Sequence, residues 1–163
     1  MKKTLMTGLL IVALLLALAH PVAAQEAESA SLREGRIGAG AYFSLGRLLD
    51  DPVAIAGAAF EYGVVDRSTL GIGYAYLDGY LMQADCLEAY ARVYVLNGAL
   101  GLYLRPSILI IGWGTETMDA VFDLGAGIEW QSPWLVYAAV QATVLFQNDE
   151  RGYMVGACLG LRL

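Results

Sequence analysis

The chain is poor in the residues that many function classes need. It has 163 residues, of which only 16% are charged, with 10 Lys and Arg against 16 Asp and Glu and a formal net charge of −6. So few basic residues exclude a nucleic-acid binder, because phosphate must be met by Lys and Arg. Two Cys are too few for a disulfide scaffold. A hydrophobic fraction of 58% excludes a disordered chain.

The first residues have the pattern of a secretory signal peptide. Lys2 and Lys3 precede an unbroken apolar run, Leu9–Ala19, and the small residues Val22–Ala24 precede Gln25. This order predicts a cleaved signal peptide over residues 1–24. The alternative is a single membrane helix, but the run is well short of the roughly 20 residues that span a bilayer. We expect residues 25–34 to form a short polar segment and residues 35–163 to form one domain.

Cleavage after residue 24 removes the only His, His20, and both Lys residues. Without His, the remaining chain cannot build a Ser-His-Asp triad, a Cys-His pair or a His-ligated metal site. A Ser-Lys pair is excluded in the same way. We therefore expect no enzymatic activity, no cofactor and no metal.

From residue 35 onward, apolar residues alternate with other residues at a period of two, which is typical of β-strands. In one segment, Glu88, Tyr90 and Arg92 share a face and Ala89 and Ala91 lie on the other. Eight such segments are separated by turn residues: Gly35–Gly46, Val53–Val65, Ser68–Asp78, Met82–Leu96, Ala99–Ile111, Met118–Gln131, Trp134–Gln147 and Gly152–Leu163.

One face of these segments is continuously apolar, whereas the other carries charge, Gly and Tyr. This is the inverted pattern of a barrel in lipid, and the segments are long enough to cross a bilayer at about 9–11 residues per strand. Connections 66–67, 97–98 and 132–133 are tight, and three of the other four are longer. Aromatic residues of the apolar face fall near both ends, as in the two girdles of a membrane barrel: Tyr62, Trp130 and Trp134 near tight turns, and Phe43, Tyr76, Phe122, Phe146 and Tyr153 near longer loops.

These features resemble the small eight-stranded outer-membrane barrels of Gram-negative-type bacteria. The resemblance covers Gly35–Leu163 and rests on the signal peptide, on the alternation and on a strand that runs to the last residue. It implies an all-β fold: an eight-stranded antiparallel up-and-down transmembrane β-barrel. It also implies outer-membrane lipid and the barrel-assembly machinery as partners, no nucleic acid, and a monomer.

The inward face carries charges that must be paired, because buried charges persist only with partners. Four acidic and four basic residues share this face: Glu61, Glu88, Asp123, Glu129, Arg36, Arg92, Arg105 and Arg162. An Asn97-Gly98 hairpin would put Leu96 opposite Ala99. Arg105 would then reach Glu88, with Asp123 approaching from the next strand. Arg36, Glu61, Arg92, Glu129 and Arg162 would form a second cluster near the tight turns, and five Tyr residues would fill the remaining interior: Tyr42, Tyr90, Tyr94, Tyr103 and Tyr137.

Two local features depart from a regular barrel strand. Pro106 cannot donate to the strand ladder, so we expect a β-bulge there, and residues 107–111 lose their alternation. Cys86 and Cys158 would lie on opposite walls, too far apart for a disulfide, so we expect two free, buried thiols.

The longer connections are acidic, with Asp50, Asp51, Asp78, Asp85, Glu116, Asp119, Asp149 and Glu150. These residues fit solvated loops, a cation-attracting rim or carboxylates bridged to anionic lipid by divalent cations. Our leading hypothesis is a non-enzymatic outer-membrane barrel with a structural or envelope-integrity role and an interior plugged by ion pairs. The alternatives are a narrow cation-selective pore, a soluble periplasmic ligand-binding barrel, and a helical membrane protein with Leu100–Gly114 as its best segment.

Overall fold

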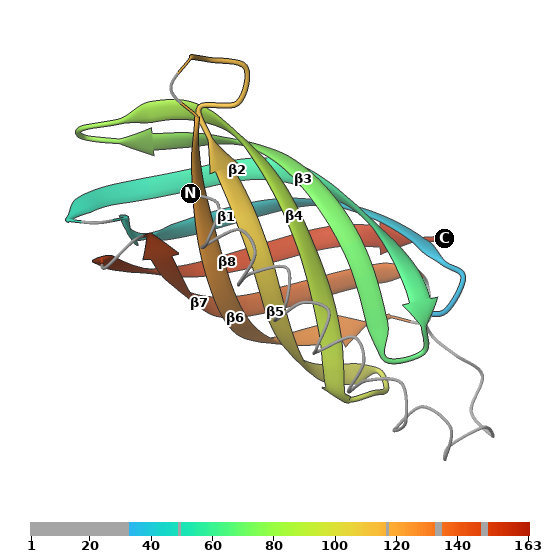
Figure 1. The fold of residues 1–163 in the computed structure, drawn as a ribbon. Coiled ribbons are helices and arrows are strands. Elements are labelled where there is room, and N and C mark those ends of the chain that lie inside the picture. The colour runs from blue at the N-terminus through green and yellow to red at the C-terminus, as the bar shows by residue number, and fades with distance from the viewer. Residues whose placement is uncertain (1–32, 49, 117, 133–134, 148–149) are drawn as a thin grey trace.

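Eight antiparallel strands close into a barrel in which each strand pairs with the next and β8 pairs with β1 (Figure 1). The expected all-β fold, an eight-stranded antiparallel barrel, is therefore confirmed. The computed structural model describes residues 33–48, 50–116, 118–132, 135–147 and 150–163. The strands are β1 (Ile37–Leu48), β2 (Asp51–Val65), β3 (Ser68–Gly79), β4 (Gln83–Leu96), β5 (Leu100–Ile111), β6 (Asp119–Gln131), β7 (Val136–Gln147) and β8 (Glu150–Arg162).

The strand bounds lie within two residues of the segments expected from the sequence. Leu100–Gly114 contains β5, so the helical alternative is wrong. Within the described residues, no helix is long and apolar enough to cross a membrane. The expected signal peptide, residues 1–24, and nearly all of the polar segment 25–34 lie outside the described residues.

The two ends of the barrel differ in the turns they carry. Figure 1 shows the β1–β2, β3–β4, β5–β6 and β7–β8 connections together at one end, which we call the loop end. The start of β1 and the end of β8 lie at the opposite end, the terminus end. The expectation of longer connections at the loop end holds only for residues 112–118 between β5 and β6, because three residues join β3 to β4 and two join β7 to β8. The β1–β2 connection is also short. It is short because Leu48 and Asp51 already pair across it.

Burial alternates along the strands with the polarity expected for an inverted barrel. Inward-facing Tyr94 and Tyr103 are 2% and 0% exposed, whereas outward-facing Phe60 and Val155 are 62% and 63% exposed. Several expected girdle residues are exposed on the outward face: Tyr62 and Trp130 toward the terminus end, and Phe43, Tyr76 and Tyr153 toward the loop end. Phe122 and Phe146 are half-buried against each other, with ring centroids 6.2 Å apart. Trp134 lies outside the described residues.

The register between β4 and β5 differs from the expected one. Tyr94, not Arg92, lies opposite Tyr103, and Glu88 lies opposite Leu109 instead of Ser107. The offset begins at the turn, where Leu96 pairs with Leu102 and not with Ala99, and a β-bulge between Tyr94 and Leu96 reduces it from three residues to two. The Asn97 side chain also donates to Asp66 Oδ2 at 2.6 Å, which ties this turn to the β2–β3 turn. A slip of two residues keeps every side chain on its expected face, because the period of a strand is two.

The expected bulge at Pro106 is also absent. Tyr90 pairs with Ser107 and Val93 with Leu104, so the register is the same on both sides of the proline. On its other side, Pro106 pairs with Leu124 of β6 without a shift. Pro106 therefore lies in β5 without a bulge, where pairing with β4 is interrupted between the Tyr90–Ser107 and Val93–Leu104 pairs.

Inward glycines make room for the interior tyrosine rings. Gly127 of β6 lies opposite Tyr103, and a Cβ there would come 2.5 Å from the Tyr103 ring carbon Cζ and 2.6 Å from the Val140 carbonyl oxygen. Two residues away on the same face, a Cβ at Gly125 would meet the end of the Thr143 side chain at 2.9 Å, a group that can rotate away.

We predict that Gly127→Ala lowers the free energy of unfolding by about 1–3 kcal/mol, because overpacking forces the Tyr103 ring or the backbone to move. Gly125→Ala, on the same face of the same strand, should cost clearly less. Denaturant midpoints in detergent measure both variants. Equal effects would show that the Gly127 position is not limited by Tyr103.

Candidate functional site

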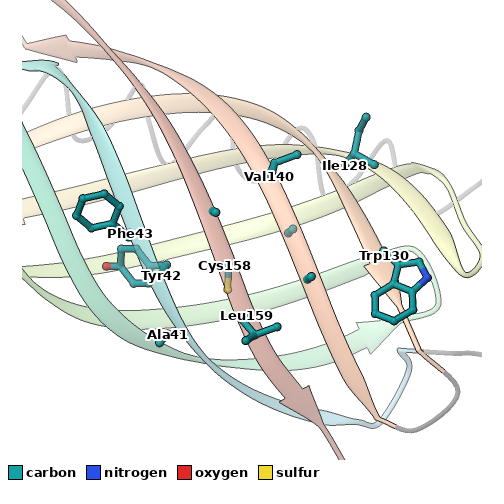
Figure 2. A pocket seen from close by; sticks show the side chains of 11 residues that line it. Ala41, Tyr42, Phe43, Ile128, Trp130, Val140, Cys158 and Leu159 are labelled. Carbon is teal, nitrogen blue, oxygen red and sulfur yellow. The ribbon is translucent and has the colours of Figure 1, made fainter.

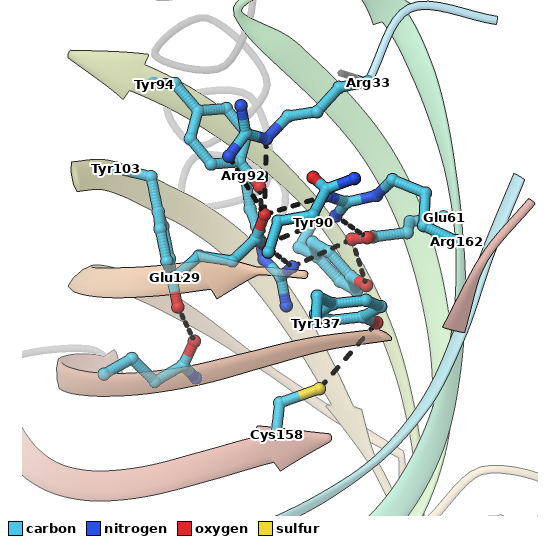
Figure 3. A network of polar contacts seen from close by, with 12 residues as sticks. Arg33, Glu61, Tyr90, Arg92, Tyr94, Tyr103, Glu129, Tyr137, Cys158 and Arg162 are labelled. Carbon is cyan, nitrogen blue, oxygen red and sulfur yellow. Dashed lines mark hydrogen bonds and ion pairs between the residues drawn. The ribbon is translucent and has the colours of Figure 1, made fainter. Parts of the chain in front are cut away.

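A buried cluster of ion pairs fills the barrel interior toward the terminus end (Figure 3). Glu129 of β6 is fully buried and lies at its centre. Its carboxylate pairs with Arg162 at 2.8 Å, with Arg92 at 3.0 Å and with Arg33 at 3.2 Å, and it accepts a hydrogen bond from Tyr94 Oη at 2.8 Å. Arg92 also pairs with Glu61 of β2 at 3.0 Å, and Arg162 pairs with the same carboxylate. We call Arg33, Glu61, Arg92, Glu129 and Arg162 the terminal cluster.

Tyrosine rings separate and cover these guanidinium groups. The Arg33 guanidinium carbon lies 3.9 Å from the centre of the Tyr94 ring, and that of Arg162 lies 4.6 Å from the Tyr137 ring. Such contacts between a cation and an aromatic face are attractive when both groups are desolvated. The five Tyr residues expected in the interior all lie on inward positions of their strands. The terminal cluster is therefore packed as well as paired.

Arg33 takes the place in this cluster that the sequence had suggested for Arg36. Arg33 is fully buried, whereas Arg36 is half-buried, and the ion pairs found among the described residues do not include it. A turn causes the exchange: the Arg36 amide donates to the Arg33 carbonyl at 3.1 Å, and Gly35 adopts a positive φ of 71°. The turn directs the Arg33 side chain into the terminus end of the barrel, where it also donates a hydrogen bond to the Asn97 side chain. Alternation could not reveal this contact, because Arg33 precedes the first strand.

A second, smaller cluster lies nearer the middle of the barrel. Arg105 of β5 pairs with Glu88 of β4 at 2.7 Å, and Ser107 donates to the same carboxylate at 3.0 Å. Asp123 of β6 approaches Arg105 only to 3.9 Å, and its Oδ1 atom has no hydrogen-bond partner. Glu88, Arg105, Ser107 and Asp123 form what we call the middle cluster. It brings together the three charged residues that the sequence placed near each other, in spite of the shifted register.

The loop-end part of the interior is apolar, which the sequence analysis did not predict. Eleven buried side chains from all eight strands fill it, and we call them the apolar layer: Leu48, Val53, Ile55, Ala75, Leu77, Cys86, Leu109, Ile111, Val121, Leu145 and Met154. The lost alternation of residues 107–111 was a signal for it, because the inward residues Leu109 and Ile111 belong to this layer. A cavity of about 30 Å³ separates the layer from the middle cluster, and this volume holds about one water molecule.

The acidic residues of the loop end do not share one environment. Asp51 is 7% exposed, and its carboxylate accepts hydrogen bonds from the Tyr80 and Leu81 amides at 3.1 and 2.9 Å. It is therefore a buried turn-binding group and not part of an exposed rim. The other described acidic residues of this set are exposed, whereas Asp149 lies outside the described residues: Asp50, Asp78, Asp85, Glu116, Asp119 and Glu150.

Both cysteines are free thiols. Cys86 is buried in the apolar layer, whereas Cys158 is only half-buried and lies 3.9 Å from the Tyr137 hydroxyl. In the part of the chain that the structure describes, no group of three or more His, Cys, Asp or Glu side chains is placed to hold a metal ion.

A shallow apolar hollow of about 540 Å³ lies on the wall formed by β1, β6, β7 and β8 (Figure 2). Small outward residues, including Ala41, Ala138 and Ala157, form its floor, and the larger Phe43 and Trp130 border it. The hollow has no converging set of polar groups that would orient a polar substrate.

No model of a known protein family matches the chain, and no curated protein matches it. Solved structures do. The N-terminal β-barrel domain of Pseudomonas aeruginosa OprF is similar with a TM-score of 0.63 and 13% identity, covering 80% of this chain and 98% of that one. Neisserial surface protein A, NspA, is similar with a TM-score of 0.54 and 10% identity, covering 78% of this chain and 96% of that one. A de novo designed transmembrane β-barrel is similar with a TM-score of 0.56 and 15% identity, covering 81% of this chain and 100% of that one. The chain therefore has the fold of the small eight-stranded outer-membrane barrels.

We predict that Arg105→Ala destabilises the barrel by about 3–5 kcal/mol, because it leaves the buried carboxylates of Glu88 and Asp123 without a cation. The triple variant Arg105→Met, Glu88→Gln and Asp123→Asn should recover part of this loss, since no unpaired charge remains. Unfolding in detergent measures both variants. A triple variant less stable than the single one would mean that Arg105 matters through its packing alone.

The exchange of Arg36 for Arg33 gives a second prediction. Arg33→Ala should lower the denaturant midpoint clearly more than Arg36→Ala, because Arg33 pairs with the buried Glu129, whereas Arg36 takes part in none of the described ion pairs. A lost hydrogen bond to a charged group costs about 1.5–3 kcal/mol. The reverse order would show that the turn at residues 33–36 does not hold Arg33 in the interior.

Proposed function

We propose that this protein is a non-enzymatic integral outer-membrane barrel with a structural, envelope-integrity role and an interior closed to ions. The observation that carries the proposal is the filling of the interior along its length by the terminal cluster, the middle cluster and the apolar layer. An eight-stranded barrel is just wide enough for side chains to fill it. The apolar layer adds a barrier that an ion cannot cross by exchanging partners, because it offers no charged side chain.

The outward face supports residence in a membrane. Large apolar side chains such as Phe60, Ile72 and Leu159 are about 60% exposed there, and water would disfavour so much exposed apolar surface. Outer-membrane lipid covers this face in the proposal, with the signal peptide directing export and the barrel-assembly machinery inserting a monomer. In a soluble ligand-binding barrel, water would have to cover this apolar outward face. Such a barrel would also need an interior cavity larger than the one of about 30 Å³ found here.

The narrow cation-selective pore is the second candidate, and the exposed acidic residues of the loop end favour it. We predict little or no steady conductance in planar bilayers, because a path for ions would require separating buried ion pairs at a cost of about 3–5 kcal/mol for each charge left unpaired. The apolar layer would still remain to be crossed. Large, steady, cation-selective currents from the unmodified protein would replace the closed-barrel proposal with the pore.

The same preparation tests membrane residence. The protein should remain in the outer-membrane fraction through a carbonate wash and should migrate differently on SDS gels before and after boiling. Ala126→Arg, which puts a cation on the outward face of β6, should impair membrane assembly or stability. Arg151→Lys at the loop end keeps its charge and serves as the control that should have no effect. Release of the unmodified protein in soluble form would contradict the proposal.

A further inference from the structure

The turn between β3 and β4 presents two large apolar side chains to solvent. Tyr80 is 88% exposed and Leu81 is 77% exposed, more than any other large apolar side chain among the described residues. The tip formed by Tyr80 and Leu81 lies at the loop end and is not part of the barrel wall (Figure 1).

The tip is held rigidly from within the protein. The Asp51 carboxylate of β2 accepts both tip amides, and the Gly79 amide donates to the Met82 carbonyl at 2.8 Å. Met82 in turn packs against the apolar layer. A backbone fixed in this way loses little entropy when its side chains bind a partner. Tyr is also among the residues that contribute most to protein interfaces.

In the proposed membrane placement, this tip lies outside the bilayer that covers the apolar outward face. On the same hairpin, Tyr76 is paired with Asp85 and Asp78 with Gln83, and both Asp residues are exposed. The outward face therefore changes from aromatic to acidic at this level, and Tyr80 and Leu81 lie beyond it. This inference rests on the proposed membrane residence but not on the closed interior.

The charge around the tip selects the kind of partner. Exposed acidic residues surround the loop end, namely Asp50, Asp78, Asp85, Glu116, Asp119 and Glu150, whereas Arg47 and Arg151 are the exposed basic residues described there. An anionic lipid surface, nucleic acid or the same end of a second copy would be repelled. A segment that combines Lys or Arg with apolar side chains matches both the carboxylates and the tip.

We propose that the β3–β4 tip is a docking site for a cationic, apolar peptide segment of a partner protein. Tyr80 and Leu81 contact the apolar side chains of that segment, and Asp78 and Asp85 pair with its basic residues. The apolar contacts set the lifetime of the complex, and the surrounding carboxylates speed its formation, as electrostatic complementarity does at interfaces.

The test uses the full mature protein in nanodiscs of zwitterionic lipid and two synthetic peptides of equal length and equal Leu content. One peptide carries only Lys as its charged residue and the other only Glu. The Lys peptide should bind, more weakly as salt increases, and the Glu peptide should not, after subtraction of binding to empty nanodiscs. Tyr80→Ser with Leu81→Ser should weaken binding by about tenfold or more, as removal of an interface centre does. Asp78→Asn with Asp85→Asn should weaken it and reduce its salt dependence.

Leu100→Ser is the matched control, because Leu100 is 63% exposed at the opposite end of the barrel. It should leave peptide binding unchanged, and heat-modifiable migration shows that each variant is folded. Equal binding of both peptides, no binding above empty nanodiscs, or undiminished binding by the double serine variant would overturn the proposal. So would a double variant that loses affinity for anionic vesicles but not for the peptide, since the tip would then be a lipid contact. None of these outcomes depends on conductance or membrane fractionation, which test the proposed function separately.

Discussion

The pairing of Glu129 with three arginines is the interaction on which the interior of this barrel depends. A fully buried carboxylate is stable only when cations and hydrogen-bond donors surround it. Arg92 reaches it from β4, Arg162 from β8 and Arg33 from the turn before β1. The Glu129 side chain of β6 thus connects β4, β8 and the turn that precedes β1. The closed sheet provides the circumference, and Glu129 determines how its terminus end is filled.

The remaining interior follows from how charge is divided between the two clusters. The terminal cluster has three arginines for two carboxylates, and the middle cluster has one arginine for two. Arg92 and Arg105 approach the ring of Tyr90, with their guanidinium carbons 5.4 and 4.1 Å from its centre. The excess positive charge of one cluster therefore lies next to the excess negative charge of the other, with an aromatic ring between them. Neither cluster can be rearranged without disturbing the charge balance of its neighbour.

The sequence predicted the faces of the strands better than their contacts. Alternation assigned Glu88, Arg105 and Asp123 to the interior, because side-chain direction follows from a period of two that any even offset preserves. The β4–β5 register could not be predicted, since it depends on Asn97, whose side chain bonds the neighbouring turn instead of forming a two-residue hairpin. Arg33 could not be predicted either, because it lies outside the alternating segments. The apolar layer was within reach, since residues 107–111 lose their alternation where inward Leu109 and Ile111 enter it.

Composition also treated the acidic residues of the loop end as one group, whereas the structure divides them by what their oxygens bind. Both carboxylate oxygens of Asp51 accept hydrogen bonds from backbone amides of the β3–β4 turn, so Asp51 fixes the conformation of that turn. Asp78 is exposed and contributes charge to the surface. The barrel fold does not indicate what this protein does, because a designed barrel has the same architecture and a fold alone does not define a function. Above the barrel, the buried Asp51 carboxylate fixes the backbone of a turn whose Tyr80 and Leu81 side chains are exposed. A partner that covers these two side chains removes apolar surface from water, which is favourable.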